Sequence, residues 1–177
     1  NIQRINGIEP EKVDPPKSVL DRIYLERKIV RESRNKAALI KELFYNNGFS
    51  VPASGPISGV YGSQRILNGK AKSPHYGIDI ALPEGYNVLA PMDGIVLFVH
   101  NDLYFSGGTI IIGHGQGLTT SYLHLSEILV EKEEIIKKGA LIGRVGSTGR
   151  ATGPHLHWGV ELNGKRLDPQ YLTVFQK

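Results

Sequence analysis

The sequence predicts a mainly β fold, an antiparallel β-sandwich or open barrel preceded by an N-terminal arm and a helix. The chain has 177 residues, 40% hydrophobic and 21% charged, so it can bury one core with a small appendage. From Phe49 onward, glycine is frequent and β-branched runs alternate with turn sequences such as Ser-Gly-Gly and Gly-Gln-Gly. Before Phe49 the chain is first polar and proline-bearing and then carries apolar residues at helical spacing. We therefore expect an arm and an amphipathic helix over residues 1–48 and the β domain over residues 49–177.

The N-terminal part is expected to contain one arm and one helix. Residues 1–17 include EPEKVDPPK and predict a linker or an extended arm. A helix should follow, capped by Asp14 or Ser18, because Pro15-Pro16 suits a first turn, and Asn46-Asn47-Gly48 should end it. Four apolar residues recur every seven positions along it: Ile23, Val30, Ala37 and Phe44. They predict a narrow buried stripe on a charged helix, whose Lys and Arg form either a solvated face or a contact with an anionic polymer.

The β-rich part contains short runs of strand composition that are separated by turn sequences. These runs are residues 57–61, 77–82, 87–90, 93–100, 108–113, 118–124, 140–145 and 155–162. Many short strands at this spacing are typical of antiparallel β domains.

Composition limits the partners and the kinds of site. Cysteine is absent, so disulfides and thiolate metal sites are excluded, and any zinc must be held by His and carboxylate. No apolar run approaches the roughly 20 residues of a membrane-spanning helix. The net charge of +4 suits an anionic polymer such as cell-wall material or nucleic acid, or serves solubility alone. Because the chain opens with Asn1, we expect a processed form or a fragment from which an export signal was removed.

Two histidines are separated by one leucine in GPHLHWGVEL. On a helix, positions two apart point in different directions, but on a strand they share a face. Trp158, Val160 and Leu162 follow with a two-residue rhythm that favours a strand. His155 and His157 should therefore face the same side, as a metal ligand and a neighbour that acts on the same substrate, with Trp158 in the core.

A second cluster, His75 and Asp79 in HYGID, also has an even offset, and SYLHL adds His124. Each motif is common by chance, but their joint presence in one small β domain indicates a metal site. Catalytic zinc takes three protein ligands and keeps one position open, and a further histidine can act as base or stabilise an oxyanion. HExxH is absent, which excludes the helical metalloprotease design.

Several segments together resemble the LytM/lysostaphin-type zinc endopeptidases of bacterial cell walls. These segments are GIDIA, APMDGIV, TTSYLHL, GALIGRVGSTGRATGPHLHWGVELNG and LDP, within about residues 56–172. The resemblance implies Zn²⁺ bound by His75, Asp79 and His157, with His124 as general base and His155 as its non-ligand partner. It also implies peptidoglycan peptide stems as substrate, no nucleic-acid partner, and a location in the periplasm or cell envelope.

Two alternative functions of other classes fit the residues less well. A catalytically inactive wall-binding or activator module of the same fold should have lost site residues, yet all five positions are intact. A biotinyl-like carrier needs a modifiable lysine beside methionine, but Asp93 follows the only methionine, Met92. Among enzymes, D-alanyl–diaminopimelate cross-links are favoured over glycine bridges, and the arm could lie across the cleft and regulate access.

The remaining candidates receive structural or open assignments. His114 is expected in a structural turn and His100 at the surface. Tyr122 could line the cleft or pack in the core. Arg65 resembles a family arginine, but the spacing differs and no role is carried across. The polar insertion at residues 66–74 is expected to form a cleft wall.

Overall fold

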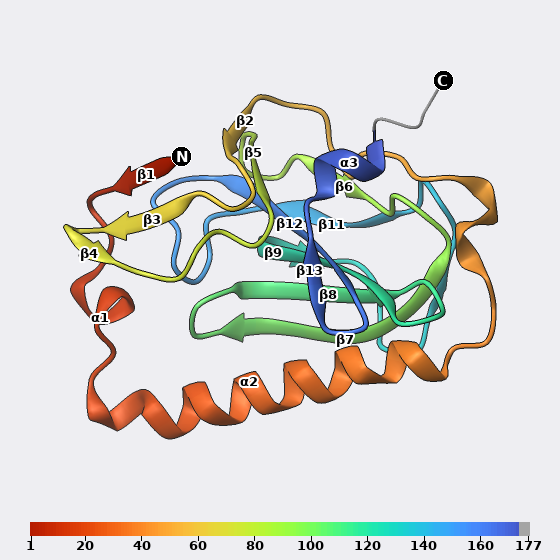
Figure 1. Ribbon diagram of the computed structural model, residues 1–177, viewed down its shortest axis with the longest axis horizontal. Helices are drawn as coiled ribbons and strands as arrows, with labels where there is room; N and C mark the ends of the chain where they lie inside the picture. The colour runs from red at the N-terminus through yellow and green to blue at the C-terminus, as the bar shows by residue number, and fades with distance from the viewer. Residues whose placement is uncertain (174–177) are drawn as a thin grey trace.

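The computed structural model describes residues 1–173 and contains a large sheet, a small second sheet and a long helix that packs along β7 and β8 (Figure 1). The strands are β1 Ile2–Ile5, β2 Ile57–Gly59, β3 Gln64–Leu67, β4 Lys70–Ala71, β5 Ile78–Ala81, β6 Asn87–Leu89, β7 Gly94–Leu103, β8 Gly107–Gly113, β9 Leu118–Ile128, β10 Ile135–Ile136, β11 Leu141–Val145, β12 His155–Leu162 and β13 Lys165–Leu167. The α-helices are α1 Pro10–Val13, α2 Leu20–Asn35 and α3 Pro169–Thr173, and the 3₁₀ turns are η1 Lys17–Val19, η2 Lys36–Leu39 and η3 Phe44–Asn47.

The large sheet is antiparallel throughout. Its main path runs β10-β7-β8-β9-β12-β5-β2, while β11 pairs with β9 and β6, and β13 pairs with β12. The path ends at β10 and β2 without closing, within the part of the chain that the structure describes. The prediction of a mainly β, open antiparallel fold is therefore confirmed.

Every predicted strand run contains a strand, but five short strands were missed: β1, β3, β4, β10 and β13. The second sheet has the order β1-β3-β4, and β1 pairs with β3 in parallel, from Ile2 opposite Gln64 to Ile5 opposite Leu67. The segment predicted as a linker or an extended arm thus contains a strand. Its partner lies some 60 positions away in the sequence, and no local pattern encodes such a pairing.

The helix is shorter than predicted. α2 ends at Asn35, and the chain then tightens into η2. The carbonyl of Ala37 accepts a hydrogen bond from the N–H of Gly117, and the carbonyl of Ile40 accepts one from Gln116. These bonds tie the chain after Asn35 to the turn after β8, where the predicted helix would have continued.

The predicted helix cap is also wrong. Val19 is the N-cap of α2 and makes no side-chain capping bond. Asp14 instead forms ion pairs with Lys70 and Lys72, the second at 3.1 Å. The charges of the hairpin β3–β4 therefore compete for the side chain that the local sequence assigns to the helix end.

The main core lies within the large sheet and contains Trp158 and Tyr122, both with no exposed side-chain surface. This confirms the expected core position of Trp158. It also shows that Tyr122 packs in the core and does not line the cleft. Burying each such side chain stabilises the fold by about 2–3 kcal/mol.

Three smaller apolar clusters attach residues 1–48 to the β domain. Val13 and Ile8 pack on Leu67, Ala37 and Ile40 pack on Leu97, and Val30 packs on Phe98 and Leu103. Residues of the predicted apolar stripe thus face the domain although the helix ends early. The domain boundary near residue 48 stays a prediction.

His114 is buried just after β8, in the structural role expected for it. Its Nδ1 lies 2.6 Å from the carbonyl oxygen of Asp93, and its Nε2 lies 2.8 Å from Thr120 Oγ1. Because a carbonyl oxygen only accepts, Nδ1 carries the proton and Nε2 accepts from the hydroxyl. Burial lowers the pKa of His114 to about 4.

We expect this histidine to weaken the fold in acid. In the unfolded chain it takes up a proton near pH 6.5, whereas in the folded chain it does so only near pH 4. Its stabilising contribution is therefore complete above about pH 6.5 and falls by roughly 3 kcal/mol as pH drops through the folded pKa. Urea unfolding at several pH values should show a steeper loss for the wild type than for His114→Gln; equal slopes would contradict the assignment.

Candidate active site

Two paired strands place three of the candidate residues. β12 runs antiparallel to β5, with His157 opposite Asp79 and His155 opposite Ala81. Leu156 and Trp158, on the other face of β12, have no exposed surface. The two-residue rhythm therefore sends both histidines to one side of the sheet and the apolar side chains to the core.

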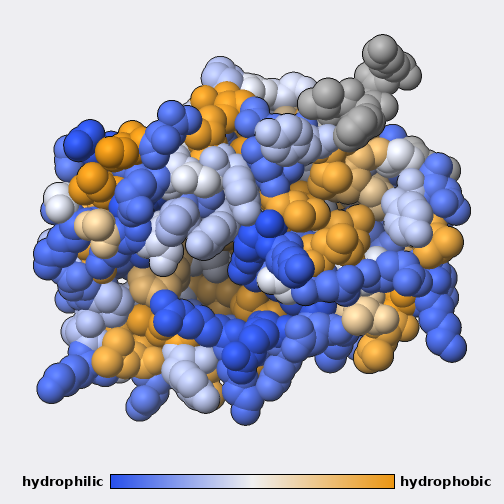
Figure 2. All heavy atoms as spheres, viewed as in Figure 1, coloured by the Kyte–Doolittle hydropathy of each residue, from blue (hydrophilic) through white to orange (hydrophobic). Residues whose placement is uncertain are grey.

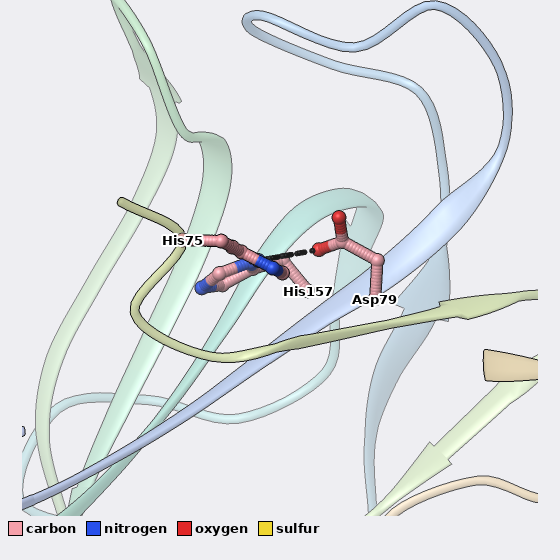
Figure 3. A group of neighbouring side chains, drawn as sticks. All are labelled: His75, Asp79 and His157. Carbon is pink, nitrogen blue, oxygen red and sulfur yellow. Dashed lines mark hydrogen bonds and ion pairs between the residues drawn. The ribbon is translucent and has the colours of Figure 1, made fainter. Parts of the chain in front are cut away.

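His75 joins them from the loop before β5. Its Nδ1 lies 3.1 Å from the carbonyl oxygen of Val60, so Nδ1 carries the proton and Nε2 carries the lone pair. Nε2 lies 3.0 Å from Asp79 Oδ1 and 2.9 Å from His157 Nδ1. His157 Nδ1 lies 2.9 Å from the same carboxylate oxygen. Figure 3 shows the three side chains converging, and one ligand atom of each lies within 4.8 Å of the others.

His124 reaches the site through a bulge in β9. Leu125 pairs with Gly108 and Tyr122 with Ile110, so β9 has one residue more than β8 in this interval. His124 adopts a φ of 65°, a left-handed conformation that is uncommon for a residue with a Cβ. Such bulges redirect a side chain next to a functional site. Here the bulge brings the ring of His124 to 4.7 Å from that of His155 and 6.3 Å from that of His157, between centroids.

The two histidines outside the three-residue cluster are oriented in the same way. His124 Nδ1 lies 2.7 Å from the carbonyl oxygen of Thr148, and His155 Nδ1 lies 2.9 Å from that of Gly153. Each Nδ1 therefore donates, and each Nε2 is left for chemistry. His155 Nε2 lies 3.9 Å from Asp79 Oδ1, so the pair borders the cluster.

The surroundings keep the carboxylate ionised and two of the imidazoles neutral. Burial raises the pKa of Asp79, but the close contacts of its carboxylate with His157 and His75 and the charge of Arg65 outweigh burial and hold the pKa below its usual range. Burial lowers the pKa of His157 to about 4. Burial, with the nearby rings of His155 and His157, lowers the pKa of His124 to about 3. One anionic oxygen and neutral ring nitrogens form the donor set that suits a borderline divalent cation.

Arg65 is a site residue to which the sequence assigned no role. Its guanidinium forms an ion pair with Asp79 Oδ2, the oxygen that does not contact the histidines. Partners of this kind fix the orientation of a ligating carboxylate. In the sequence, Arg65 in YGSQR resembles an arginine of the family. Its spacing differs from the family's, so the sequence alone did not assign it a role.

Gly77 permits the close approach of the loop to His157. A Cβ at this position would lie 2.6 Å from the carbonyl oxygen of Trp158 and 2.7 Å from His157 Nε2. The backbone between His75 and Asp79 can therefore lie against the ring only if residue 77 lacks a side chain.

The site opens into a cleft with two cavities. The larger, of about 650 Å³, contains His75, His124 and His157, and the smaller, of about 300 Å³, contains Asp79 and His155. Figure 2 shows the surface hollowed above α2, with hydrophilic residues at its border.

The walls of the larger cavity come from two parts of the chain. Leu67 and residues 72–74 of the polar insertion form one wall, as expected, and Val13, Leu20 and Ile23 of the N-terminal part form another. The arm thus borders the cleft. His100, in contrast, lies exposed on β7 and stacks on Phe98 at 6.2 Å between ring centroids.

Several known proteins are similar to this chain in sequence and in fold. Peptidoglycan DD-endopeptidase ShyA of Vibrio cholerae serotype O1 is 44% identical over 105 residues, which are 59% of this chain and 24% of that protein. The crystal structure of a putative peptidase M23 from Pseudomonas aeruginosa has a TM-score of 0.73 at 35% identity, covering 88% of this chain and 62% of that one. A zinc-containing peptidase from Vibrio cholerae has a TM-score of 0.61 at 35% identity, covering 72% and 39%.

The chain spans about a quarter of the length of several curated relatives that it matches. The family model of peptidase family M23 matches residues 73–169, more than half of the chain, and this range includes all five candidate site residues. The resemblance to LytM/lysostaphin-type enzymes is confirmed at this level: the chain belongs to peptidase family M23.

Proposed function

We propose that this protein is a zinc-dependent endopeptidase that hydrolyses D-alanyl–diaminopimelate cross-links of bacterial peptidoglycan. The observation that supports this most strongly is the cluster of His75, Asp79 and His157 with two further histidine Nε2 atoms beside it in an open cleft. The similarity to ShyA, a peptidoglycan DD-endopeptidase, supports the same substrate.

The cluster fits zinc by its donor chemistry. Two imidazole nitrogens and one carboxylate oxygen match catalytic zinc sites, which keep a further position open. The hydrogen bond from His75 Nδ1 to Val60 and the ion pair of Asp79 with Arg65 supply outer support for two of the ligands. Zinc held by His75, Asp79 and His157 would supply Lewis acidity, polarising the scissile carbonyl and lowering the pKa of water.

The other two histidines have separate roles in this proposal. His124 is neutral near neutral pH, and its Nδ1–H is held by Thr148, so Nε2 can take a proton from the attacking water. His155 Nε2 faces the same space and, when protonated, can stabilise the oxyanion or supply a proton to the leaving amine.

The location follows from the substrate. Peptidoglycan lies in the cell envelope, so we place the protein in the periplasm or envelope, with peptide stems as its partners. No helix among the described residues is long and apolar enough to span a membrane.

Digestion of two defined substrates tests the bond that is cleaved. The zinc-loaded protein should split a D-alanyl–diaminopimelate dimer and leave a pentaglycine-bridged peptide intact. Faster cleavage of the glycine bridge would instead support a glycine-bridge endopeptidase. Binding of cross-linked peptides without cleavage of either would support a non-catalytic wall-binding module.

We further propose that the arm limits access to the cleft. Val13 is buried against Leu67, and both line the larger cavity.

The variant Val13→Asp should lose about 2 kcal/mol of the free energy by which burial of Val13 stabilises the docked arm. The arm should therefore shift toward an open state. We expect it to hydrolyse intact peptidoglycan roughly tenfold faster than the wild type. The control Leu25→Asp places the same charge on the exposed face of α2 and should not change the rate. Equal rates for all three proteins would contradict regulation by the arm.

A further inference from the structure

Arg150 lies in the wall that the two cavities share, in the loop between β11 and β12. Its backbone N–H donates to the carbonyl of Phe105 at 2.8 Å, and its guanidinium lies 4.6 Å from the centroid of the Phe105 ring. Its Nη1 reaches the carbonyl oxygen of Lys12 at 3.5 Å. These contacts hold the guanidinium in one orientation and occupy few of its five N–H donors.

The other cations of the larger cavity are mostly neutralised. Arg65 is paired with Asp79, Lys72 with Asp14, and Arg166 with Glu161. No carboxylate lies within 4.0 Å of Arg150 among residues 1–173, and the same holds for Arg27 on α2.

Arg150 is thus a half-buried cation with no counter-ion within the described residues 1–173. Burial, followed by repulsion from Arg65 and Arg27, lowers the pKa of Arg150. A cation in this state gains more from an anionic ligand than an exposed one does, because it is already partly desolvated.

We propose that Arg150 is a specificity-determining residue that binds a substrate carboxylate beside the scissile bond. This inference rests on the proposed function. In a D-alanyl–diaminopimelate cross-link, the carbon that bears the scissile nitrogen also bears a free carboxylate, whereas a glycine bridge has no charge there. Arginine pairs with a carboxylate through two parallel hydrogen bonds.

The position of Arg150 agrees with this role. It shares the larger cavity with His124 and His157 and the smaller one with Asp79 and His155. A peptide that crosses the cluster therefore passes Arg150 on the way from one cavity to the other. Arg65 is less suited, because its ion pair with the proposed ligand Asp79 makes it a positioning residue.

The test compares two cross-linked dimers that differ only at this carboxylate, which is free in one and amidated in the other. We expect wild-type protein to prefer the free acid roughly 10- to 100-fold in kcat/KM, as for a charge-assisted hydrogen bond. Arg150→Gln should cleave the free acid more slowly than the wild type and therefore lose this preference. Its rate on the amide should stay within about twofold of the wild-type rate. Arg150→Lys should retain part of the preference, because lysine keeps the charge but cannot make two parallel hydrogen bonds to a carboxylate. Arg166→Gln, which removes a paired cation from the same cavity, should keep the preference.

Two results would overturn the inference. Equal losses on both dimers would show that Arg150 only supports the fold, and an unchanged preference in Arg150→Gln would place the recognition elsewhere. If the wild type cleaves neither dimer, the proposed function fails. Calorimetric binding of both dimers to zinc-loaded protein then tests the carboxylate subsite independently of cleavage. In that assay, tighter binding of the free acid by the wild type and not by Arg150→Gln supports the subsite, and equal binding rejects it.

Discussion

Replacing Asp79 with asparagine is expected to remove zinc and abolish hydrolysis. The substitution takes away the one anionic donor of the cluster and leaves the guanidinium of Arg65 without its partner. Loss of an outer partner alone typically costs 10- to 100-fold in metal affinity, so loss of this ligand should weaken zinc binding by more than roughly 100-fold. Zinc content after dialysis, measured by mass spectrometry, gives the result directly.

Two further variants make this test specific. His75→Ala removes a neutral ligand and should also lose zinc, although Asp79 remains. His100→Ala removes an exposed imidazole on β7 and should bind zinc like the wild type. Full zinc occupancy in Asp79→Asn and His75→Ala would refute the assignment of the metal ligands.

Replacing His124 is expected to separate catalysis from metal binding. His124 lies outside the cluster of proposed ligands, so the variant should keep its zinc and lose turnover by roughly 100- to 10,000-fold, the usual contribution of a general base. His124→Asn is preferred to His124→Ala, because asparagine tolerates the positive φ at this position. Thermal unfolding should be near that of the wild type.

The outcome is read from zinc content and rate together. Loss of zinc in His124→Asn would show that this histidine belongs to the ligand set. A rate within tenfold of the wild type, with zinc bound, would assign the proton transfer to another group, with His155 as the first candidate.

The local parts of the site were predictable from sequence. The two-residue rhythm of β12 is a property of any strand, so the shared face of His155 and His157 followed from HLHWGVEL alone. The same rhythm placed Trp158 in the core. Cysteine content restricted the ligand types without any structural knowledge.

The non-local parts were not predictable. The left-handed His124 arises where β9 pairs with β8 and β11 in different registers, and its own sequence does not show this. The early end of α2 depends on N–H groups of the turn after β8, far away in the chain. The ion pair of Arg65 with Asp79 and the parallel pairing of β1 with β3 likewise exist only once distant segments meet.

Digestion of purified, cross-linked peptidoglycan tests whether the protein is a zinc-dependent endopeptidase that uses His124. Three preparations are compared, namely zinc-loaded wild type, chelator-treated wild type and zinc-loaded His124→Asn, and the released muropeptides are identified by mass. Only the first is expected to convert D-alanyl–diaminopimelate dimers into monomers, with the addition of one water and a free amine on diaminopimelate. Intact dimers with zinc fully bound, or equal cleavage by His124→Asn, would contradict this expectation.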